Sequence, residues 1–165
     1  MIQKRILVVD DVPDWRATLR DALNKNYEVK TVDSYQAAME IIQKREAELV
    51  IVDLRLSPTD ENDRQGMDLL KELAERKINS IVLTGYSEQA LQEEAEEKYK
   101  AFDFIDKSML SRNLKRLQDV VYEAFKLLEK QQEKKNNAIK AASAFQTVTF
   151  TPDLSSWPLR KYRKK

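Results

Sequence analysis

Three carboxylates stand at points where short apolar runs of the sequence end. Asp10 and Asp11 follow the run at residues 5–9, and Asp53 follows the run at residues 49–52. Carboxylates held close together repel one another and stay ionised only when a cation neutralises them. A hard divalent ion is the natural partner, because such ions prefer oxygen ligands. If the chain brings these acids together, the sequence therefore predicts a cation site.

The runs before these acids are continuous and apolar, which is typical of strands buried on both faces of a parallel sheet. In such sheets ligands bind at the carboxyl ends of the strands. Thr84 and Lys107 stand at or just past the ends of two further predicted strands, at 79–84 and 101–105. We therefore expect a hydroxyl and an amine at the same edge of the sheet as the acids.

Strand and helix patterns alternate five times along the chain with short connections. This alternation predicts an α/β fold, a doubly wound sandwich around a five-stranded parallel sheet. Pro13 suits a first helical turn, and Ser34 and Ser87 are candidate N-caps. Gly85 allows a sharp exit from its strand. The predicted strands are 5–9, 27–32, 49–53, 79–84 and 101–105, and the predicted helices are near 13–23, 35–45, 67–73, 87–100 and from 108 onward.

Residues 57–66 are polar, contain a proline and show no apolar periodicity, so they predict a loop beside the site. A solvated loop is the interpretation we favour. Its acids would otherwise repel an acidic donor or pair with neighbouring arginines. The acids are Asp60, Glu61 and Asp63, and the arginines are Arg55 and Arg64.

Composition removes several classes of chemistry. The 165 residues contain no cysteine and no histidine, which excludes disulfides, thiolate or imidazole metal sites and Ser-His-Asp catalysis. No apolar run approaches the roughly 20 residues that span a bilayer. The N-terminus has no long apolar core of the kind a secretory signal needs, so we expect a cytoplasmic protein without a membrane span.

With the segments VVDD (8–11), VDL (52–54), LTG (83–85) and FIDKS (104–108), the chain resembles the receiver domain of two-component response regulators. The resemblance covers roughly residues 4 to 125. Each segment alone is common, and their joint spacing over five alternating units makes the match specific. The resemblance implies a CheY-like fold and a signalling switch that is not an enzyme.

The resemblance also implies roles for the site residues. Asp53 would accept a phosphoryl group from a histidine kinase or phosphotransfer partner, with Mg2+ as cofactor. Asp11, Asp53 and the backbone carbonyl of Arg55 would bind the ion directly, and Asp10 would act mainly through water. The ion and Lys107 would offset the charge that develops on the phosphoryl group.

Switching in the family runs through Thr84, whose hydroxyl turns toward the phosphoryl group, and through an aromatic residue at the position of Phe104. This chain departs from the family pattern at two positions. Phe104 stands where tyrosine is more common and cannot donate a hydrogen bond, so the coupling is expected to be weaker. Ser108 follows Lys107 where proline is usual, so no cis bond is expected there.

Residues 126–165 differ in charge from the predicted receiver domain, residues 1–125. They hold ten basic and three acidic residues, whereas the rest of the chain holds 19 and 25. Apolar residues spaced by three and four continue the last helix beyond the length that a domain needs, which favours a coiled coil. We prefer a homodimer through the fourth and fifth helices, with the extended last helix as the alternative.

The terminal segment 136–165 carries scattered aromatics, two prolines and a basic end. It fits a solvated terminus or a segment that docks on an unknown downstream protein, through residues 148–152 for example. The basic end at 160–165 could contact nucleic acid or anionic lipid. DNA binding is the least favoured, because no helix-turn-helix or winged-helix pattern is present.

Three functions compete. The leading one is a phosphorylation-dependent signalling switch that acts through protein contacts. The alternative is a phosphorylation-independent receiver-like module for interaction and assembly, which uses the C-terminal helix and tail. An aspartate-nucleophile phosphohydrolase is set aside, because that class has a second acid two residues after the nucleophile, and this chain has Arg55 there.

Overall fold

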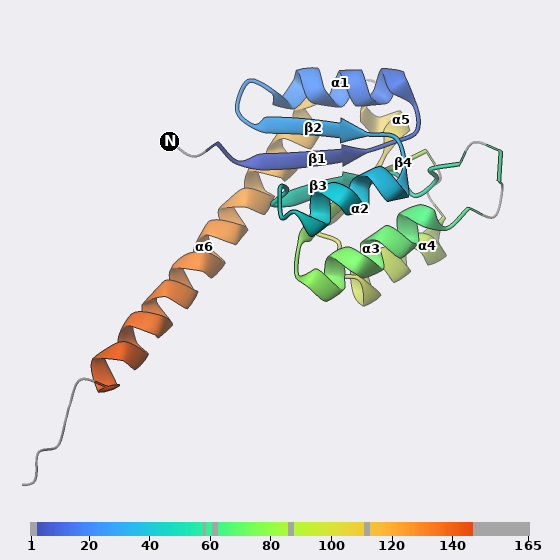
Figure 1. The fold of residues 1–165 in the computed structure, drawn as a ribbon. Helices are drawn as coiled ribbons and strands as arrows, with labels where there is room; N and C mark the ends of the chain where they lie inside the picture. Colours follow the sequence, from blue (N-terminus) through green and yellow to red (C-terminus); the bar gives the residue numbers. More distant parts are fainter. Residues whose placement is uncertain (1–2, 58, 61–62, 86–87, 111–112, 147–165) are drawn as a thin grey trace, which may run out of the picture. The chain divides into compact units, whose positions relative to one another are not determined.

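The protein is described by a computed structural model that covers residues 3–57, 59–60, 63–85, 88–110 and 113–146. Five parallel strands form one sheet in the order β2-β1-β3-β4-β5, as Figure 1 shows in part. The predicted α/β class and parallel sheet are confirmed. The strands are β1 (Arg5–Val9), β2 (Glu28–Val32), β3 (Leu49–Val52), β4 (Asn79–Thr84) and β5 (Asp103–Asp106).

Helices follow the strands in alternation. The helical elements are α1 (Pro13–Leu23), α2 (Tyr35–Gln43), α3 (Gln65–Arg76), α4 (Gln89–Glu93), the π-helical turn η1 (Glu94–Lys98), α5 (Lys107–Leu110) and α6 (Lys115–Gln146). Pro13 opens α1 as predicted, and Ser34 occupies the N-cap of α2, although its side chain makes no capping hydrogen bond. Ser87 lies outside the described residues.

The sheet is covered on both faces, as its apolar strands require. On one face, side chains such as Leu7, Val50 and Val82 form a cluster with buried residues of α2, α3 and η1. On the other face, the first part of α6 packs beside α1, where the Gln118 side-chain amide donates to the Ala22 carbonyl at 2.8 Å. Strands β1 and β3 are therefore buried on both faces, and the chain reaches solvent only at the ends of these strands.

The order of the strands reverses between β1 and β3. The chain passes from β1 to β2 on one side and then crosses to β3 on the other. Ligands of doubly wound sheets bind at such a point, outside the carboxyl ends of the strands. Asp10 and Asp11 follow β1 and Asp53 follows β3, so the topology places all three acids there.

The prediction of one continuous last helix from residue 108 onward is wrong. Helix α5 ends at Leu110, and α6 begins at Lys115. The Asn113 side-chain oxygen accepts a hydrogen bond from the Lys115 amide at 3.0 Å, which is the contact of a helix N-cap. A capping side chain inside an apolar pattern thus starts a new helix where periodicity alone predicted one continuous element.

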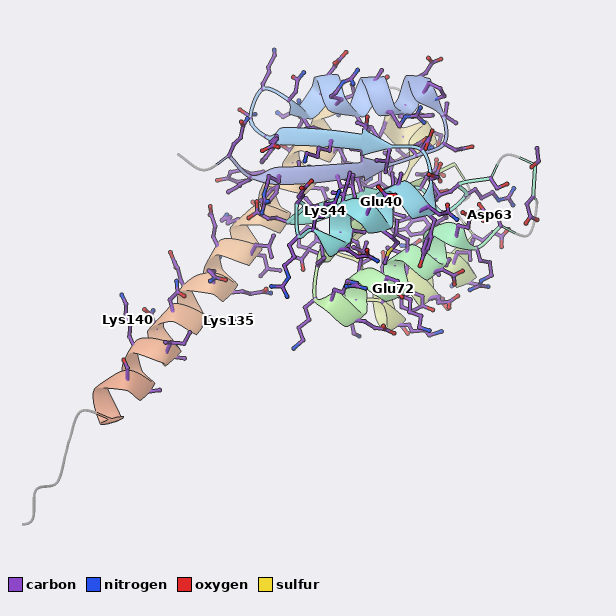
Figure 2. The ribbon with its side chains drawn as sticks, viewed as in Figure 1. Glu40, Lys44, Asp63, Glu72, Lys135 and Lys140 are labelled. Carbon is purple, nitrogen blue, oxygen red and sulfur yellow. The ribbon has the colours of Figure 1, made fainter. Side chains whose placement is uncertain are left out.

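The chain separates into two compact units, residues 1–127 and 128–165, and α6 runs through the boundary. In the second unit the described side chains of residues 129–143 are exposed, and Ile139 is 67% exposed. Figure 2 shows side chains of this part of α6, with Lys135 and Lys140 labelled. The segments 148–152 and 160–165 lie outside the described residues. No helix in the described part of the chain is both long enough and apolar enough to span a membrane.

Candidate functional site

Backbone hydrogen bonds fix the acids at the edge of the sheet. The Asp53 amide donates to the Val9 carbonyl at 2.9 Å, and the Asp10 amide donates to the Val32 carbonyl at 3.1 Å. Both residues thus continue the parallel ladder one step beyond their strands. Their side chains are therefore positioned by the inner strands β1 and β3.

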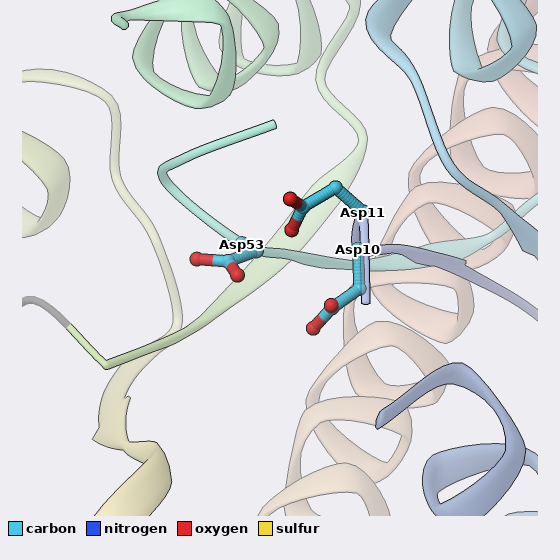
Figure 3. Close-up of side chains that lie close together, drawn as sticks. All are labelled: Asp10, Asp11 and Asp53. Atoms are coloured by element: carbon cyan, nitrogen blue, oxygen red, sulfur yellow. The ribbon is translucent and has the colours of Figure 1, made fainter. Parts of the chain in front are cut away.

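The three predicted acids lie together. One carboxylate oxygen each from Asp10, Asp11 and Asp53 falls within 4.8 Å of the others. Figure 3 shows the three side chains gathered at the ends of their strands. Asp10 and Asp53 are 1% and 5% exposed, and Asp11 is half-buried. The cluster is therefore open to solvent mainly on the side of Asp11.

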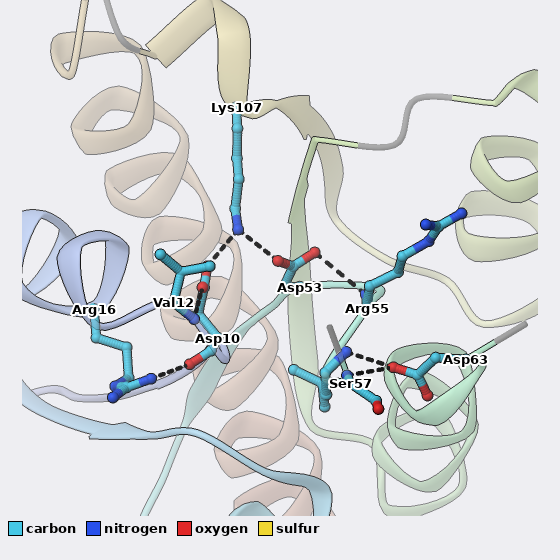
Figure 4. Close-up of polar contacts among 9 residues, drawn as sticks. Asp10, Val12, Arg16, Asp53, Arg55, Ser57, Asp63 and Lys107 are labelled. Carbon is cyan, nitrogen blue, oxygen red and sulfur yellow. Dashed lines mark hydrogen bonds and ion pairs between the residues drawn. The ribbon is translucent and has the colours of Figure 1, made fainter. Parts of the chain in front are cut away.

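Lys107 joins this cluster from the end of the edge strand β5. Its Nζ lies 2.5 Å from Asp53 Oδ2 and 2.7 Å from Asp10 Oδ2 (Figure 4). The residue begins α5 directly after β5, and it is only 8% exposed. The structure thus brings together the amine and the three acids that the sequence analysis selected.

The switch candidates lie nearby in the sheet. Val52 pairs with Val82, so Thr84 and Asp53 both stand past this register position at the same edge. Thr84 is fully buried. Phe104 lies in β5, is 7% exposed and belongs to the apolar cluster between the sheet and α2, α3 and η1. Its side chain points into this cluster.

Arg55 follows Asp53 in the loop, and its amide faces the Asp53 carboxylate at 3.4 Å (Figure 4). Its guanidinium points away from the acids in that view. The peptide bond between Lys107 and Ser108 is trans, like every other bond in the part of the chain that the structure covers.

Burial controls the charge of Asp10. Removal from water raises the pKa of this carboxyl above its ordinary value. A hydrogen bond and the positive charge of Lys107 act in the opposite direction, and the neighbouring Asp53 adds to the rise. The Val12 amide also donates to Asp10 Oδ1 at 3.0 Å, which favours the charged form.

The donor set fits a hard divalent cation. Three carboxylates from two adjacent strands converge, whereas Lys107 supplies one positive charge against their three negative ones. Carboxylate and carbonyl oxygens are the ligands that Mg2+ prefers, and the ion usually keeps several waters. The half-exposed Asp11 gives solvent a route to the cluster. Mg2+ could be held here by Asp11, Asp53 and the Arg55 carbonyl.

Gly66 is a site residue that the sequence analysis did not select. A Cβ atom at this position would lie 2.5 Å from Leu54 Cα and 2.6 Å from Leu54 O, and would also strike the Asp53 carbonyl oxygen. The start of α3 therefore packs directly on the backbone that carries Asp53. Gly85, which the sequence analysis did note, has open space at its Cβ position and no positive φ.

Asp63 was expected to lie in a solvated loop, and it instead organises that loop. Its Oδ2 accepts hydrogen bonds from the amides of Leu56 and Ser57 at 2.6 and 2.8 Å, and its Oδ1 accepts one from the Gln65 amide at 2.9 Å. Figure 4 shows the contact with Ser57. An aspartate in mid-loop carries no periodic signal, and only its tendency to bond local amides pointed to this role.

Among the described residues, Arg64 pairs with an acid outside its own loop. Its guanidinium lies 2.9 Å from Glu94, the first residue of η1. Glu94 also accepts hydrogen bonds from Lys98 and Tyr99, both at 3.1 Å. The loop after β3 is thereby tied to the π-helical turn.

Solved structures with this fold include receiver domains of several organisms. Response regulator TrrA of Thermotoga maritima, solved with Mg2+ and beryllofluoride, is 28% identical with a TM-score of 0.59 over 73% of this chain and 97% of its own. The non-phosphorylated HemR receiver domain of Leptospira biflexa is 26% identical with a TM-score of 0.61 over 72% and 94%. A CheY-like receiver domain protein of Methanospirillum hungatei is 22% identical with a TM-score of 0.56 over 73% and 98%.

No curated protein matches the chain. The model of the response regulator receiver domain family matches residues 6–119, which is most of the chain. The strand order, the acids at the switch point of the sheet and this match agree with the resemblance seen in the sequence. The chain belongs to the response regulator receiver domain family.

Proposed function

We propose that this protein is a phosphorylation-dependent signalling switch that accepts a phosphoryl group on Asp53. The observation that carries the proposal is the position of Lys107 Nζ, 2.5 Å from Asp53 Oδ2, opposite the acids that follow β1. The donor would be the phosphohistidine of a histidine kinase or phosphotransfer protein. The family and the donor chemistry support a cytoplasmic switch rather than an enzyme.

In the proposed reaction, a carboxylate oxygen of Asp53 attacks the phosphorus of the donor. An O–P bond forms as the P–N bond to the donor imidazole breaks, and the electron pair of that bond stays with the nitrogen. Lys107 stabilises the negative charge that develops on the transferred oxygens. Mg2+, when bound by Asp11, Asp53 and the Arg55 carbonyl, with Asp10 acting through water, supplies further neutralisation of charge.

The new phosphoryl group adds about −1.5 to −2 charges and new acceptor oxygens at the end of β3. The Thr84 hydroxyl, buried at the end of the neighbouring strand, would turn toward it and draw the loop after β4 inward. Phe104 would follow this movement as an apolar side chain. Signalling would then pass through the face formed by α4, β5 and the predicted fifth helix, which the structure divides into α5 and α6.

The buried state of Phe104 also favours a second candidate function. A phenylalanine held in the core and unable to hydrogen-bond is compatible with a phosphorylation-independent interaction module. In that case the receiver fold would be a scaffold for assembly through the C-terminal helix and tail.

We also propose the division into a receiver domain, residues 1–125, and an extended helix with a basic tail, residues 126–165. A homodimer through the fourth and fifth helices, or through α6, would cover exposed apolar side chains. Tyr122, Leu127 and Ile139 on α6 are 58%, 40% and 67% exposed. The downstream partner is expected to be a protein.

The decisive experiment incubates the protein with Mg2+ and acetyl phosphate and measures the mass of the intact chain. We expect an increase of one phosphoryl group in the native protein and none in Asp53→Asn. Asp21→Asn, which neutralises an exposed acid of α1, is the matched control and should be modified normally. Modification of Asp53→Asn would rule out the assigned acceptor, and no modification of the native protein would favour the assembly module.

A further inference from the structure

An aromatic ring lies beside the amine of the site. Lys107 Nζ is 5.3 Å from the centroid of the Trp15 ring. Trp15 belongs to α1, far in the sequence from α5, which begins with Lys107, and it is half-buried. The family roles considered above do not include this residue.

Local structure fixes the position of the ring. Pro13 is the first residue of α1, so this helix starts immediately after the acids of β1 and Trp15 falls in its first turn. The same ring lines a cavity of about 220 Å3 together with Thr18 and with Leu110 of α5. Trp15 therefore lies between the first turn of α1 and the short helix that begins with Lys107.

The contacts of the ammonium group leave a place for the ring. An ammonium has three N–H donors. Asp53 and Asp10 accept at 2.5 and 2.7 Å, and no further acceptor of Lys107 is found among the described residues. A tryptophan face within about 6 Å attracts a cation through its quadrupole. Trp15 thus supplies the remaining attraction on Lys107.

Burial distinguishes this contact from the other cation–π contacts of the described residues. The Lys107 side chain is 10% exposed, whereas those of Lys98 and Lys126, which lie over Tyr99 and Tyr122, are 64% and 46% exposed, and Lys4, which lies over Phe125, is half-buried. Cation–π attraction is strongest where the cation is removed from water. The Trp15 contact is therefore the one expected to have a measurable effect.

From this geometry we infer that Trp15 is a positioning residue that holds the Lys107 ammonium over the acid site. When the charge of Asp10 and Asp53 is met by a cation, their attraction for Lys107 weakens. The ring is neutral and keeps its attraction, so Lys107 stays within reach of the acceptor. The kinetic consequence rests on the proposed phosphorylation of Asp53, whereas the contact itself does not.

The test changes the ring electronically with little change of shape. Trp157→Phe leaves Trp15 as the single tryptophan, because the chain has two. Fluorinated tryptophans with increasing numbers of fluorine atoms are then incorporated, since each fluorine withdraws charge from the ring face. We expect the rate of Asp53 modification by acetyl phosphate to fall stepwise, by about 3- to 10-fold over the series.

Conventional variants give the same comparison at lower resolution. Trp15→Leu should lower the rate of Asp53 modification by most of this 3- to 10-fold range, which is about what a cation–π contact supports. Trp15→Phe should lower the rate less, because it keeps an aromatic ring. Tyr122→Leu, at the exposed contact with Lys126, is the matched control and should leave the rate unchanged. Equal rates across the fluorinated series, with a slow Trp15→Leu, would reduce Trp15 to a space-filling role and overturn the inference.

A second measurement separates this inference from the proposed function. Unfolding of Trp15→Leu, Lys107→Met and the double variant, without any phosphodonor, gives the coupling between the two side chains. A favourable coupling supports the contact even if acetyl phosphate modifies no variant, in which case only the proposed function fails. Zero coupling together with a flat fluorinated series overturns the inference even where Asp53 is phosphorylated.

Discussion

Among single residues, Asp10 shows most directly what the site costs the fold. Burial raises the pKa of its carboxyl above 3.8, the ordinary value that applies in the unfolded chain. The folded state therefore binds a proton more tightly than the unfolded state does. This carboxyl destabilises the fold at pH values above its folded pKa, and the penalty disappears as pH falls through that pKa toward 3.8.

Asp10→Asn tests whether the charged carboxylate destabilises the fold. Without divalent cations at pH 7, we expect the variant to melt about 2–6 °C above the native protein, the shift that roughly 1 kcal/mol produces in a domain of this size. The difference should shrink as the pH is lowered toward 4, since the native carboxyl then becomes protonated. Thermal unfolding followed by circular dichroism measures both. A lower melting temperature for Asp10→Asn at pH 7 would show that its bonds to Lys107 and Val12 outweigh burial.

Mg2+ should reverse the order of the two melting temperatures, so that the native protein melts above Asp10→Asn. A ligand that binds only the folded state stabilises it according to its affinity and concentration. The native protein should gain more from the ion than Asp10→Asn does, because the variant has one charge fewer in the cluster. Equal gains in the two proteins would contradict the placement of Asp10 beside the cation.

The two glycines of the chain form a matched pair. Gly66→Ala places a methyl group against the backbone of Leu54 and Asp53, so we expect a loss of about 1–3 kcal/mol in the free energy of unfolding. Gly85→Ala meets nothing within 4 Å and should stay within about 0.5 kcal/mol of the native value. Urea unfolding of both variants provides the comparison, and similar losses would argue against the close packing of α3 on the acceptor strand.

At the scale of elements, the loop between β3 and α3 depends on one carboxylate. Asp63 accepts three backbone hydrogen bonds and closes the loop beside Asp53. We expect Asp63→Ala to lower the free energy of unfolding by about 1.5–3 kcal/mol, the range for hydrogen bonds to a charged group. Glu75→Ala, an exposed acid of α3, is the control and should have little effect.

The same variant has a consequence for the site. The loop directly follows Asp53, so losing the hydrogen bonds of Asp63 should weaken Mg2+ binding as well as lower the free energy of unfolding. Glu75→Ala should change neither quantity. Titration of Mg2+ by Trp15 fluorescence in the Trp157→Phe background measures the affinity. An unchanged affinity in Asp63→Ala would separate the loop from the cation site.

At the scale of the whole molecule, the part of α6 beyond Leu127 has no explanation inside the receiver fold, because its described side chains are largely exposed. Helix α6 has 32 residues, and Leu128 and Ile139, which are three helical turns apart, lie on one face. An isolated helix in water is marginal below about 12–15 residues, and longer ones still gain most of their stability from packing. A second copy of the chain would supply that packing.

We therefore expect a dimer in solution by sedimentation or light scattering, and a monomer after removal of residues 126–165. Ile139→Glu should shift the full chain toward monomer if α6 forms the interface, whereas Asn137→Glu, on an exposed neighbouring position, should not. A monomer for both the full and the shortened chain would reject the dimer. A dimer that survives both the truncation and Ile139→Glu would instead favour an interface through α4 and the part of the predicted fifth helix that precedes residue 126.

The sequence by itself determined the layered α/β fold and the ends of the strands that carry the acids. These features depend on local patterns: continuous apolar runs such as residues 49–52, helical stripes and the residue that follows each strand. Because parallel strands in one sheet end at a common edge, the sequence also predicted that Asp53 and Lys107 would approach each other. In the structure the two side chains lie 2.5 Å apart.

Only the tertiary structure decided which groups touch. Asp63 bonds backbone amides, Gly66 lies on the acceptor strand, Trp15 stands beside Lys107, and Asn113 divides the last helix. None of these contacts leaves a periodic trace, because each depends on how two elements or a loop pack at distances of a few ångströms. Local patterns fix the identity of an element, whereas packing between elements fixes the contacts of its side chains.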